Sequence, residues 1–262
     1  FPENTDPTPL GSQSIDVQVD TEYTIVLTGS LDNPSIISWE EPERLWSATD
    51  TVFEIDFVHL SPLAGEIDVY FDAQGNAPVL GNQIGTFTNG QRLPYKEYPE
   101  GPYELILTAP GDPSTVLFQS PTVLGIPAQR ITVAVFDPEP SITAPFAVNA
   151  FFPSGENSTL PDINSPAQAR IMHAAFGTNN IDAFLNEDIT NAIFENIGFG
   201  EITNFFDLTE TATPLMLSSQ GDNSNLILQG EITRIINARL NLILWGNPDE
   251  LYIRDLEQSG RP

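Results

Sequence analysis

The sequence predicts an all-β fold made of two tandem antiparallel β-sandwich domains of the immunoglobulin-like or transthyretin-like kind. Three observations lead to this prediction. Short runs of β-branched and aromatic residues with alternating polarity recur along the chain, Gly-, Pro- and Asn-rich turns separate them, and one histidine-bearing strand pattern occurs twice. Regular short strands without long helical patterns are typical of sandwiches and barrels.

The strand runs come at short intervals in the first half of the chain. They cover residues 23–28, 52–58, 66–71, 103–108 and 130–136. Turn-forming residues stand between them at 31–34, 73–76, 89–90 and 110–113. One stretch, 182–199, has a pattern that also allows a short helix around residues 189–195.

The histidine-bearing segment 57–71 aligns without a gap with residues 171–185. His59 then pairs with His173, the only other histidine of the chain, and Asp68 pairs with Asp182. Two later segments repeat in the same order: 104–111 matches 214–221, and 132–136 matches 241–245. A period of about 110 residues is too long for a solenoid unit, so each copy is predicted to be a domain. The predicted division is an N-terminal extension (1–11), a first sandwich (12–140) and a second sandwich (141–262).

A further repeated strand pair lies before the first copy of the histidine-bearing segment. Residues 23–29 followed by 31–39 resemble residues 239–246 followed by 247–254, which end the second copy. The chain therefore carries two repeats and a spare strand pair. An unpaired strand edge has to be paired, covered or shared with a neighbour.

Charge and composition exclude several classes of function. The chain has 36 acidic and 9 basic residues and a net charge of −27, which disfavours nucleic acids and anionic membrane surfaces. Cations, neutral glycans and other proteins remain as partners. The absence of cysteine excludes disulfides and thiolate chemistry. No apolar stretch approaches the roughly 18 residues of a membrane helix, so we expect no membrane insertion. The start at Phe1, before a Pro-rich stretch, leads us to expect a mature terminus left by a removed signal peptide.

Several motifs resemble the bacterial domain of unknown function DUF4397. They are Val-His-Leu-Ser-Pro at 58–62, Ile-Asp-Val-Tyr at 67–70, Pro-Glu-Gly-Pro-Tyr at 99–103 and Tyr-Thr-Ile-Val-Leu-Thr-Gly at 23–29. The match is closer over residues 20–137 than over 165–256, where Ala175-Phe176 replaces the Ser-Pro pair. The resemblance implies a secreted β-sandwich, often in tandem, with adhesion or surface structure as its role. It implies no catalytic residues.

His59 and His173 are the first candidates for chemistry. Each precedes an aspartate on the next predicted strand, Asp68 or Asp182, so a His–Asp hydrogen bond could form half of a catalytic triad or a metal site. The chain has no Gly-x-Ser-x-Gly elbow and no His-Glu-x-x-His pair, and one histidine per domain is too few for a typical zinc site. We therefore interpret all four residues as repeat-equivalent structural residues, with the histidines buried and satisfied by hydrogen bonds. No catalytic residue is predicted.

Two binding sites are weaker candidates. Calcium favours oxygen-rich loops, and Asp72, Asp112 and Asp222 stand in such loops, but aspartates at turns also bind their own backbone. No other cofactor is predicted. Tyr95 and Tyr98, in a Pro-rich segment, are expected to be exposed and able to stack on sugar rings. The three tryptophans are also candidates, although Trp39 and Trp245 lie in strand patterns where core packing is commoner.

The leading hypothesis is a non-enzymatic, secreted or cell-surface protein with a structural or adhesive role. A more specific version makes the chain a subunit of a self-assembling extracellular filament, in which the N-terminal segment 1–39 joins another subunit's sheet edge by strand addition. The alternative is a carbohydrate- or calcium-binding module, and an enzyme is the third choice. The partners expected are other copies of the chain, other surface proteins or glycans.

Overall fold

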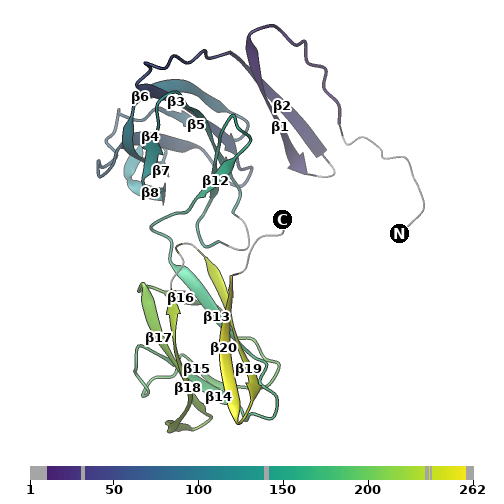
Figure 1. The fold of residues 1–262 in the computed structure, drawn as a ribbon, viewed down its shortest axis with the longest axis vertical. Coiled ribbons are helices and arrows are strands. Elements are labelled where there is room, and N and C mark those ends of the chain that lie inside the picture. Colours follow the sequence, from purple (N-terminus) through teal and green to yellow (C-terminus); the bar gives the residue numbers. More distant parts are fainter. Residues whose placement is uncertain (1–10, 31–32, 139–141, 234–235, 237, 258–262) are drawn as a thin grey trace, which may run out of the picture. The chain divides into compact units, whose positions relative to one another are not determined.

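The computed structural model describes residues 11–30, 33–138, 142–233, 236 and 238–257, and all regular structure in them is β-strand (Figure 1). The all-β prediction is confirmed. No helix among these residues is long and apolar enough to cross a membrane. The first ten strands are β1 (Thr21–Ser30), β2 (Asn33–Pro42), β3 (Val52–Leu60), β4 (Ile67–Ala73), β5 (Gly85–Phe87), β6 (Arg92–Pro99), β7 (Gly101–Ala109), β8 (Asp112–Gln119), β9 (Val123–Gly125) and β10 (Arg130–Phe136). The others are β11 (Ala147–Phe151), β12 (Asn157–Leu160), β13 (Ala167–His173), β14 (Ile181–Leu185), β15 (Phe194–Ile197), β16 (Phe206–Leu208), β17 (Ala212–Ser219), β18 (Asp222–Thr233), β19 (Arg239–Asn247) and β20 (Glu250–Glu257).

The chain forms two compact units. Unit 1 contains residues 1–115, 122–137 and 148–158, and unit 2 contains 116–121, 138–147 and 159–262. A single boundary near residue 140, as the sequence suggests, does not describe this division, because residues 116–121 group with unit 2 and residues 148–158 with unit 1.

The two units share one strand order. The first sheet of unit 1 runs β12-β11-β10-β3-β6, and the first sheet of unit 2 runs β20-β19-β13-β16. The second sheets run β5-β4-β7-β8 and β15-β14-β17-β18. In both units a parallel pair forms within the first sheet, β3 with β10 and β13 with β19. The extra strands of unit 1 are β12 beside β11 and β9 beside β7.

Each unit buries an apolar layer between its two sheets. In unit 2, Ile171 and Leu242 of the first sheet belong to one buried cluster with Ala183 and Leu217 of the second sheet. The core of unit 1 is richer in aromatic rings. Their edges and faces meet between the sheets, as in Phe57 and Phe71, whose ring centroids are 5.8 Å apart. Burial of these side chains is the main stabilising contribution to each sandwich.

The helix considered for residues 189–195 is wrong. Residues 186–193 form turns before β15, and Asn186 and Glu187 have positive φ angles of 56° and 62°. The Asp188 carboxylate accepts hydrogen bonds from the Thr190 backbone N–H, the Thr190 hydroxyl and the Asn191 side chain. These bonds lower the Asp188 pKa to about 2 and hold the turn that competes with a helix.

The spare strand pair, β1–β2, is a hairpin built like β19–β20. Both hairpins close over two-residue loops, since Ser30 pairs with Asn33 and Asn247 pairs with Glu250. Gly29 and Gly246, one residue earlier, have φ angles of 88° and 115°. A Cβ at either glycine would lie within 2.4 Å of a carbonyl oxygen across the turn, so only glycine fits there.

Gly125 gives a test of core packing. A Cβ at this β9 glycine would lie 2.0 Å from Cε1 of the fully buried Phe53 ring, whereas a Cβ at the exposed Gly65 meets no atom within 4 Å. We expect Gly125→Ala to lower the free energy of unfolding by about 1–3 kcal/mol through overpacking. Gly65→Ala should change it by less than about 0.5 kcal/mol. Urea denaturation measures both, and equal effects of the two substitutions would contradict this packing.

Candidate functional site

The β1–β2 hairpin covers one face of the first sheet of unit 1. This face points away from the sandwich core and is here called the outer face. The burial of the residues of β3 shows that the outer face is covered. Its core-facing residues are buried as expected, but Glu54, Asp56, Val58 and Leu60, which point to the outer face, are buried as well. In β13, the equivalent strand of unit 2, buried and half-buried residues alternate.

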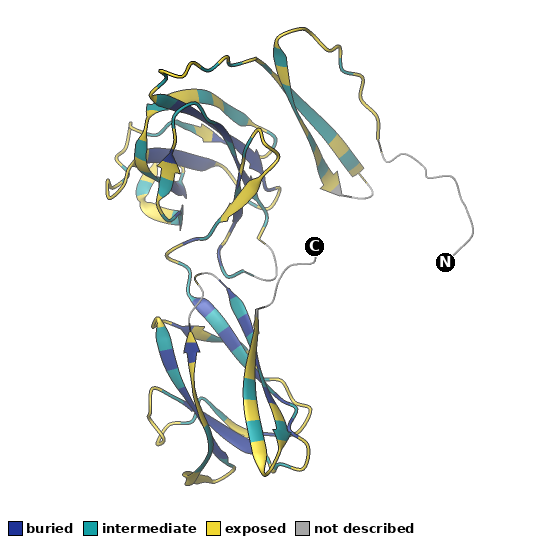
Figure 2. Cartoon of the chain, in the orientation of Figure 1, coloured by how far each residue is buried: buried dark blue, intermediate teal, exposed yellow. Residues whose placement is uncertain are grey.

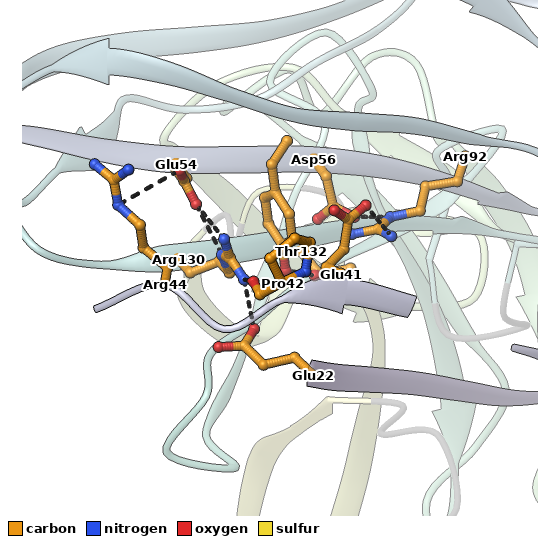
Figure 3. A network of polar contacts seen from close by, with 10 residues as sticks. Glu22, Glu41, Pro42, Arg44, Glu54, Asp56, Arg92, Arg130 and Thr132 are labelled. Carbon is orange, nitrogen blue, oxygen red and sulfur yellow. Dashed lines mark hydrogen bonds and ion pairs between the residues drawn. The ribbon is translucent and has the colours of Figure 1, made fainter. Parts of the chain in front are cut away.

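Arg130 of β10 is the first of two arginines that hold the hairpin (Figure 3). Its guanidinium donates from Nε to Glu54 Oε2 at 2.8 Å and from Nη1 to Glu22 Oε2 of β1 at 2.6 Å. Nη1 also donates to the carbonyl oxygen of Pro42, the last residue of β2, at 3.2 Å. The Arg130 side chain is only 8% exposed, so the pair with Glu54 is screened little by water. One guanidinium thus joins both strands of the hairpin to the sheet.

Arg92 of β6 makes the second attachment. Its Nε donates to the buried Asp56 carboxylate, and its Nη1 donates to Glu41 Oε1 of β2 at 2.8 Å (Figure 3). Burial raises the pKa of Asp56 above its ordinary value, while the Arg92 charge opposes that rise. Each of the two guanidinium groups thus binds a carboxylate of the sheet and a carboxylate of the hairpin. These directional contacts fix the position of the hairpin.

Tyr95 lies between the two arginines. The Arg130 and Arg92 guanidinium carbons are 4.3 Å and 4.8 Å from its ring centroid, and its hydroxyl is 3.0 Å from Thr132 Oγ1. Burial raises the pKa of Tyr95 to about 12. The ring therefore acts as a cation–π partner for both charges.

Apolar contacts complete the hairpin's attachment. Val26 of β1 and Trp39 of β2 pack against Val58, Leu60 and Ala134 of the outer face. Beside this contact, an open groove of about 670 Å³ runs along β1. It is lined by residues 22–27 of β1 and by Val58, Leu60, Tyr95, Arg130, Thr132, Ala134, Phe136, Phe151, Phe152 and Pro153.

The groove follows a strand edge that has no strand partner within the described part of the chain. β1 pairs with β2 on one side only. Its equivalent in unit 2, β19, pairs with β20 on one side and in parallel with β13 on the other. Ile25 and Leu27, beside the free edge, are 56% and 65% exposed. The site can therefore accept an extended strand.

The two histidines make identical backbone contacts. Nδ1 of His59 accepts the Ser61 N–H at 3.3 Å, and its Nε2 lies 3.0 Å from the Gly65 carbonyl oxygen. In His173, Nδ1 accepts the Ala175 N–H at 3.3 Å, and Nε2 lies 3.2 Å from the Asn179 carbonyl oxygen. Both rings are fully buried, and backbone groups occupy both nitrogens. This pattern fits the neutral ring with its proton on Nε2.

Asp68 and Asp182, the aspartates of the same repeat, accept hydrogen bonds in turns other than those that the histidines contact. Asp68 accepts the Gly111 N–H at 2.7 Å and Asp182 accepts the Gly221 N–H at 2.8 Å, in the β7–β8 and β17–β18 turns. The second carboxylate oxygens accept from the Thr86 hydroxyl and the Asn196 N–H. The hydrogen bonds that the structure gives these carboxylates are with turns and a hydroxyl, not with a histidine.

The three calcium candidates lie in three separate turns. Asp72 accepts from the Ala73 N–H and the Asn76 side chain, and Asp112 accepts from the Ser114 N–H and two hydroxyls. Asp222 accepts from the Ser224 hydroxyl. No group of three or more metal-binding side chains occurs among the described residues. The structure thus shows each of these carboxylates bonded within its own turn.

The expected exposure of the two tyrosines is wrong. Both lie on β6 rather than in a loop, and both are half-buried. Tyr98 packs against the rings of Phe53, Phe71 and Tyr103, with a shortest centroid distance of 5.1 Å to Phe71. Trp245, expected in a core, is 48% exposed instead and stacks on Tyr252 with centroids 5.0 Å apart.

The sequence alone does not point to the site that the structure forms. None of Glu22, Glu41, Arg92 and Arg130 is among the sequence candidates, because their pairing joins strands far apart in the chain. One signal was available: an arginine at the start of the apolar run 130–136 is unusual in a chain with 9 basic residues. A charged residue in a strand that becomes covered on both faces requires a buried partner.

Comparisons with known proteins give no match for this chain, neither to any family model nor to any curated protein. The resemblance to DUF4397 therefore remains a prediction from the motifs.

Replacement of Arg130 tests the attachment of the hairpin. Arg130→Met removes the two close guanidinium contacts of the buried Glu54 and leaves it only the longer ion pair with Arg44, at 3.7 Å. Breaking a buried pair costs about 3–5 kcal/mol. Arg44 follows the hairpin in the 43–51 connection, and its side chain is already 32% exposed. A hairpin that detaches more often lets this connection open locally, so we expect tryptic cleavage after Arg44 to accelerate at least about tenfold. Its equivalent in unit 2 gives the matched control. Arg239 is bonded to the neutral Gln168 at 3.1 Å, and Arg239→Met should leave cleavage after Arg44 unchanged. Equal acceleration by both substitutions would argue against the Arg130 attachment.

The protonation of His59 gives a second test. Burial lowers the pKa of His59 below its ordinary value of 6.5, because the charged ring is desolvated. The unfolded chain then binds the proton more readily than the folded one, so this contribution to stability is present above pH 6.5 and is lost as the pH falls below it. NMR titration of the ring signals should give His59 a midpoint below pH 6.5. A midpoint at or above 6.5 would refute the buried neutral ring.

Proposed function

We propose that this protein is a non-enzymatic structural or adhesive component, secreted or on the cell surface, whose copies assemble into an extracellular filament by strand addition at the N-terminal hairpin. The free edge of β1 above its apolar groove carries the proposal. Strand addition uses main-chain hydrogen bonds for affinity and needs no catalytic group.

The equivalent strands support this role for β1. β10 and β19 each have a parallel partner, β3 or β13, at the edge that β1 leaves open. A hairpin of this kind is thus compatible with a further strand. An exposed edge next to apolar side chains is also a liability for a monomer, because it favours pairing with other chains.

The hydrogen bonds of the two histidines favour a non-enzymatic role. His59 and His173 are the residues best suited to acid–base chemistry, yet both ring nitrogens of each contact backbone groups inside a core. A general base has to reach a substrate proton. The secreted or cell-surface setting belongs to the same proposal and rests on the motif resemblance.

Microscopy and sedimentation of the full chain test the proposal. We expect polymers that lengthen with concentration for the wild type. The double substitution Ile25→Ser/Leu27→Ser removes apolar surface beside the free β1 edge and should shift assembly to at least about tenfold higher concentration. The matched control is Val79→Ser/Leu80→Ser, at two adjacent residues that are 55% and 62% exposed. A wild type that stays monomeric at high concentration, or equal effects of both double substitutions, would contradict assembly through β1.

A further inference from the structure

The segment that precedes β1 carries a strand pattern without a sheet. Residues 14–19 read Ser-Ile-Asp-Val-Gln-Val, with apolar side chains at alternate positions and polar side chains between them. This alternation is typical of a strand that buries one of its faces. In the structure, however, residues 11–18 form no strand, and Val17 and Val19 are 75% and 87% exposed. Figure 2 shows most of the segment as exposed. An amphipathic strand sequence thus lies uncovered next to the hairpin.

A few side-chain contacts hold this segment against the hairpin. The Tyr23 hydroxyl donates to the Asp16 carbonyl oxygen at 3.1 Å and accepts the Gln18 N–H at 2.7 Å. The Gln13 side chain donates to the Ser38 hydroxyl at 3.0 Å. Tyr23 and Ser38 lie on the face of the hairpin that points away from unit 1, here called its far face, because they alternate with the residues that pack on the sheet. No backbone ladder has to break for the segment to leave this face.

The groove beside β1 matches the segment in length and in polarity. It follows residues 22–27 of β1, which are as many residues as segment 14–19 contains. On the side of the sheet it is lined mainly by apolar side chains, among them Leu60, Ala134, Phe136 and Phe151. A strand added at the β1 edge would direct alternate side chains to this lining and to solvent. The three apolar side chains of the segment would then cover the lining, and its polar side chains would face water.

Charge favours this segment over the long edge strands of unit 2. The groove lining contains one acid, Glu22, and one base, Arg130, and these two are bonded to each other at 2.6 Å. Segment 14–19 carries a single charge, on Asp16, which lies on its polar side. β18 has two acidic residues and no basic one, and β20 has three acidic residues and one arginine, so each has a net charge of −2. Both of these strands also already belong to a sheet.

The turn at residues 19–20 directs the segment away from the free edge of its own β1. Asp20 has a φ angle of 57°, and its carbonyl oxygen accepts the Glu43 N–H at 2.8 Å, beyond the last residue pair of the hairpin. From this turn the segment runs over the far face, where it meets Ser38. The edge of β1 thus remains open to a strand from another copy.

We propose that the strand which joins the free edge of β1 is segment 14–19 of a second copy, with Ile15, Val17 and Val19 against the groove. This inference rests on the proposed function and names the incoming strand. The segment exchanges its few contacts on the far face for main-chain hydrogen bonds along β1 of the next copy. Because the segment and the β1 edge are different surfaces, each copy offers one of each, and the contact continues head to tail into an open filament.

Substitutions on the two sides of the segment test which side meets the groove. In the full chain, Val17→Ser/Val19→Ser removes apolar surface from the proposed contact and should raise the concentration needed for assembly at least about tenfold. The matched control is Asp16→Ser/Gln18→Ser, which places two serines in the same segment but keeps all its apolar side chains. This control should assemble like the wild type. Sedimentation and microscopy over a range of concentrations measure both.

Cysteine cross-linking tests the contact directly, since the chain has no cysteine. One variant carries Asp16→Cys or Gln18→Cys, and a second carries Ile25→Cys or Leu27→Cys. A disulfide needs Cα atoms about 4.4–6.8 Å apart, so only neighbouring strands will cross-link. Each chain has one cysteine, so a disulfide can form only between copies. We expect mixed dimers in at least one of the four mixtures. The control replaces the segment variant with Gln229→Cys, at an exposed glutamine of the edge strand β18, and should give none.

The outcomes separate the inference from the proposed function. Equal assembly of the two double-serine variants, or no mixed dimers where the wild type polymerises, would overturn segment 14–19 as the incoming strand and leave assembly through β1 standing. A segment that folds back onto β1 of its own copy gives the second of these results. A wild type that remains monomeric at all concentrations overturns both. Mixed dimers, together with weakened assembly of Val17→Ser/Val19→Ser alone, support both.

Discussion

Two buried arginines determine how this chain uses its N-terminal hairpin. Arg130 and Arg92 come from strands of the first sheet of unit 1, and each binds one carboxylate of the sheet and one of the hairpin. A guanidinium that is 5–8% exposed loses much of its hydration, so only well-placed carboxylates compensate the cost of burying it. The hairpin is thus held in one position, and the groove and free edge beside it follow from that position.

The outer faces of the two units show how one strand order supports two different surfaces. Glu54 and Arg130 in unit 1 correspond to Gln168 and Arg239 in unit 2, and both pairs are hydrogen-bonded across the same parallel strands. In unit 1 the carboxylate compensates the arginine charge and the hairpin covers the pair. In unit 2 the residue at the position of Glu54 is the neutral Gln168. A change from Glu to Gln therefore accompanies the change from an outer face that is buried along β3 to one that is half-buried along β13.

The histidine repeat, in contrast, has the same function in both units. In each, the imidazole links the end of a strand to the following loop, and the aspartate of the next strand holds a glycine turn. These bonds satisfy backbone groups that would otherwise be buried without partners. The repeated residues thus maintain the sandwich, whereas the residues that differ between the units, such as Asp56 and Arg170, determine the surfaces. The candidate site combines both kinds of residue, since Arg130 is repeated as Arg239 whereas its partner Glu54 is replaced by Gln168.

The amino-acid sequence by itself determined the all-β class, the repeated strand order around His59 and His173, and the existence of a spare hairpin with its glycine turn. These features depend on local patterns: alternation with a period of two, turn residues, and motifs compared along the chain. The cover of β3 on both faces, the burial of Tyr95 and the exposure of Trp245 were decided only by the tertiary structure. The reason is physical, because a strand's alternation shows that it has two faces but not what lies against each of them. Arg130 and Glu22 are 108 residues apart in the sequence, and no local pattern records their contact.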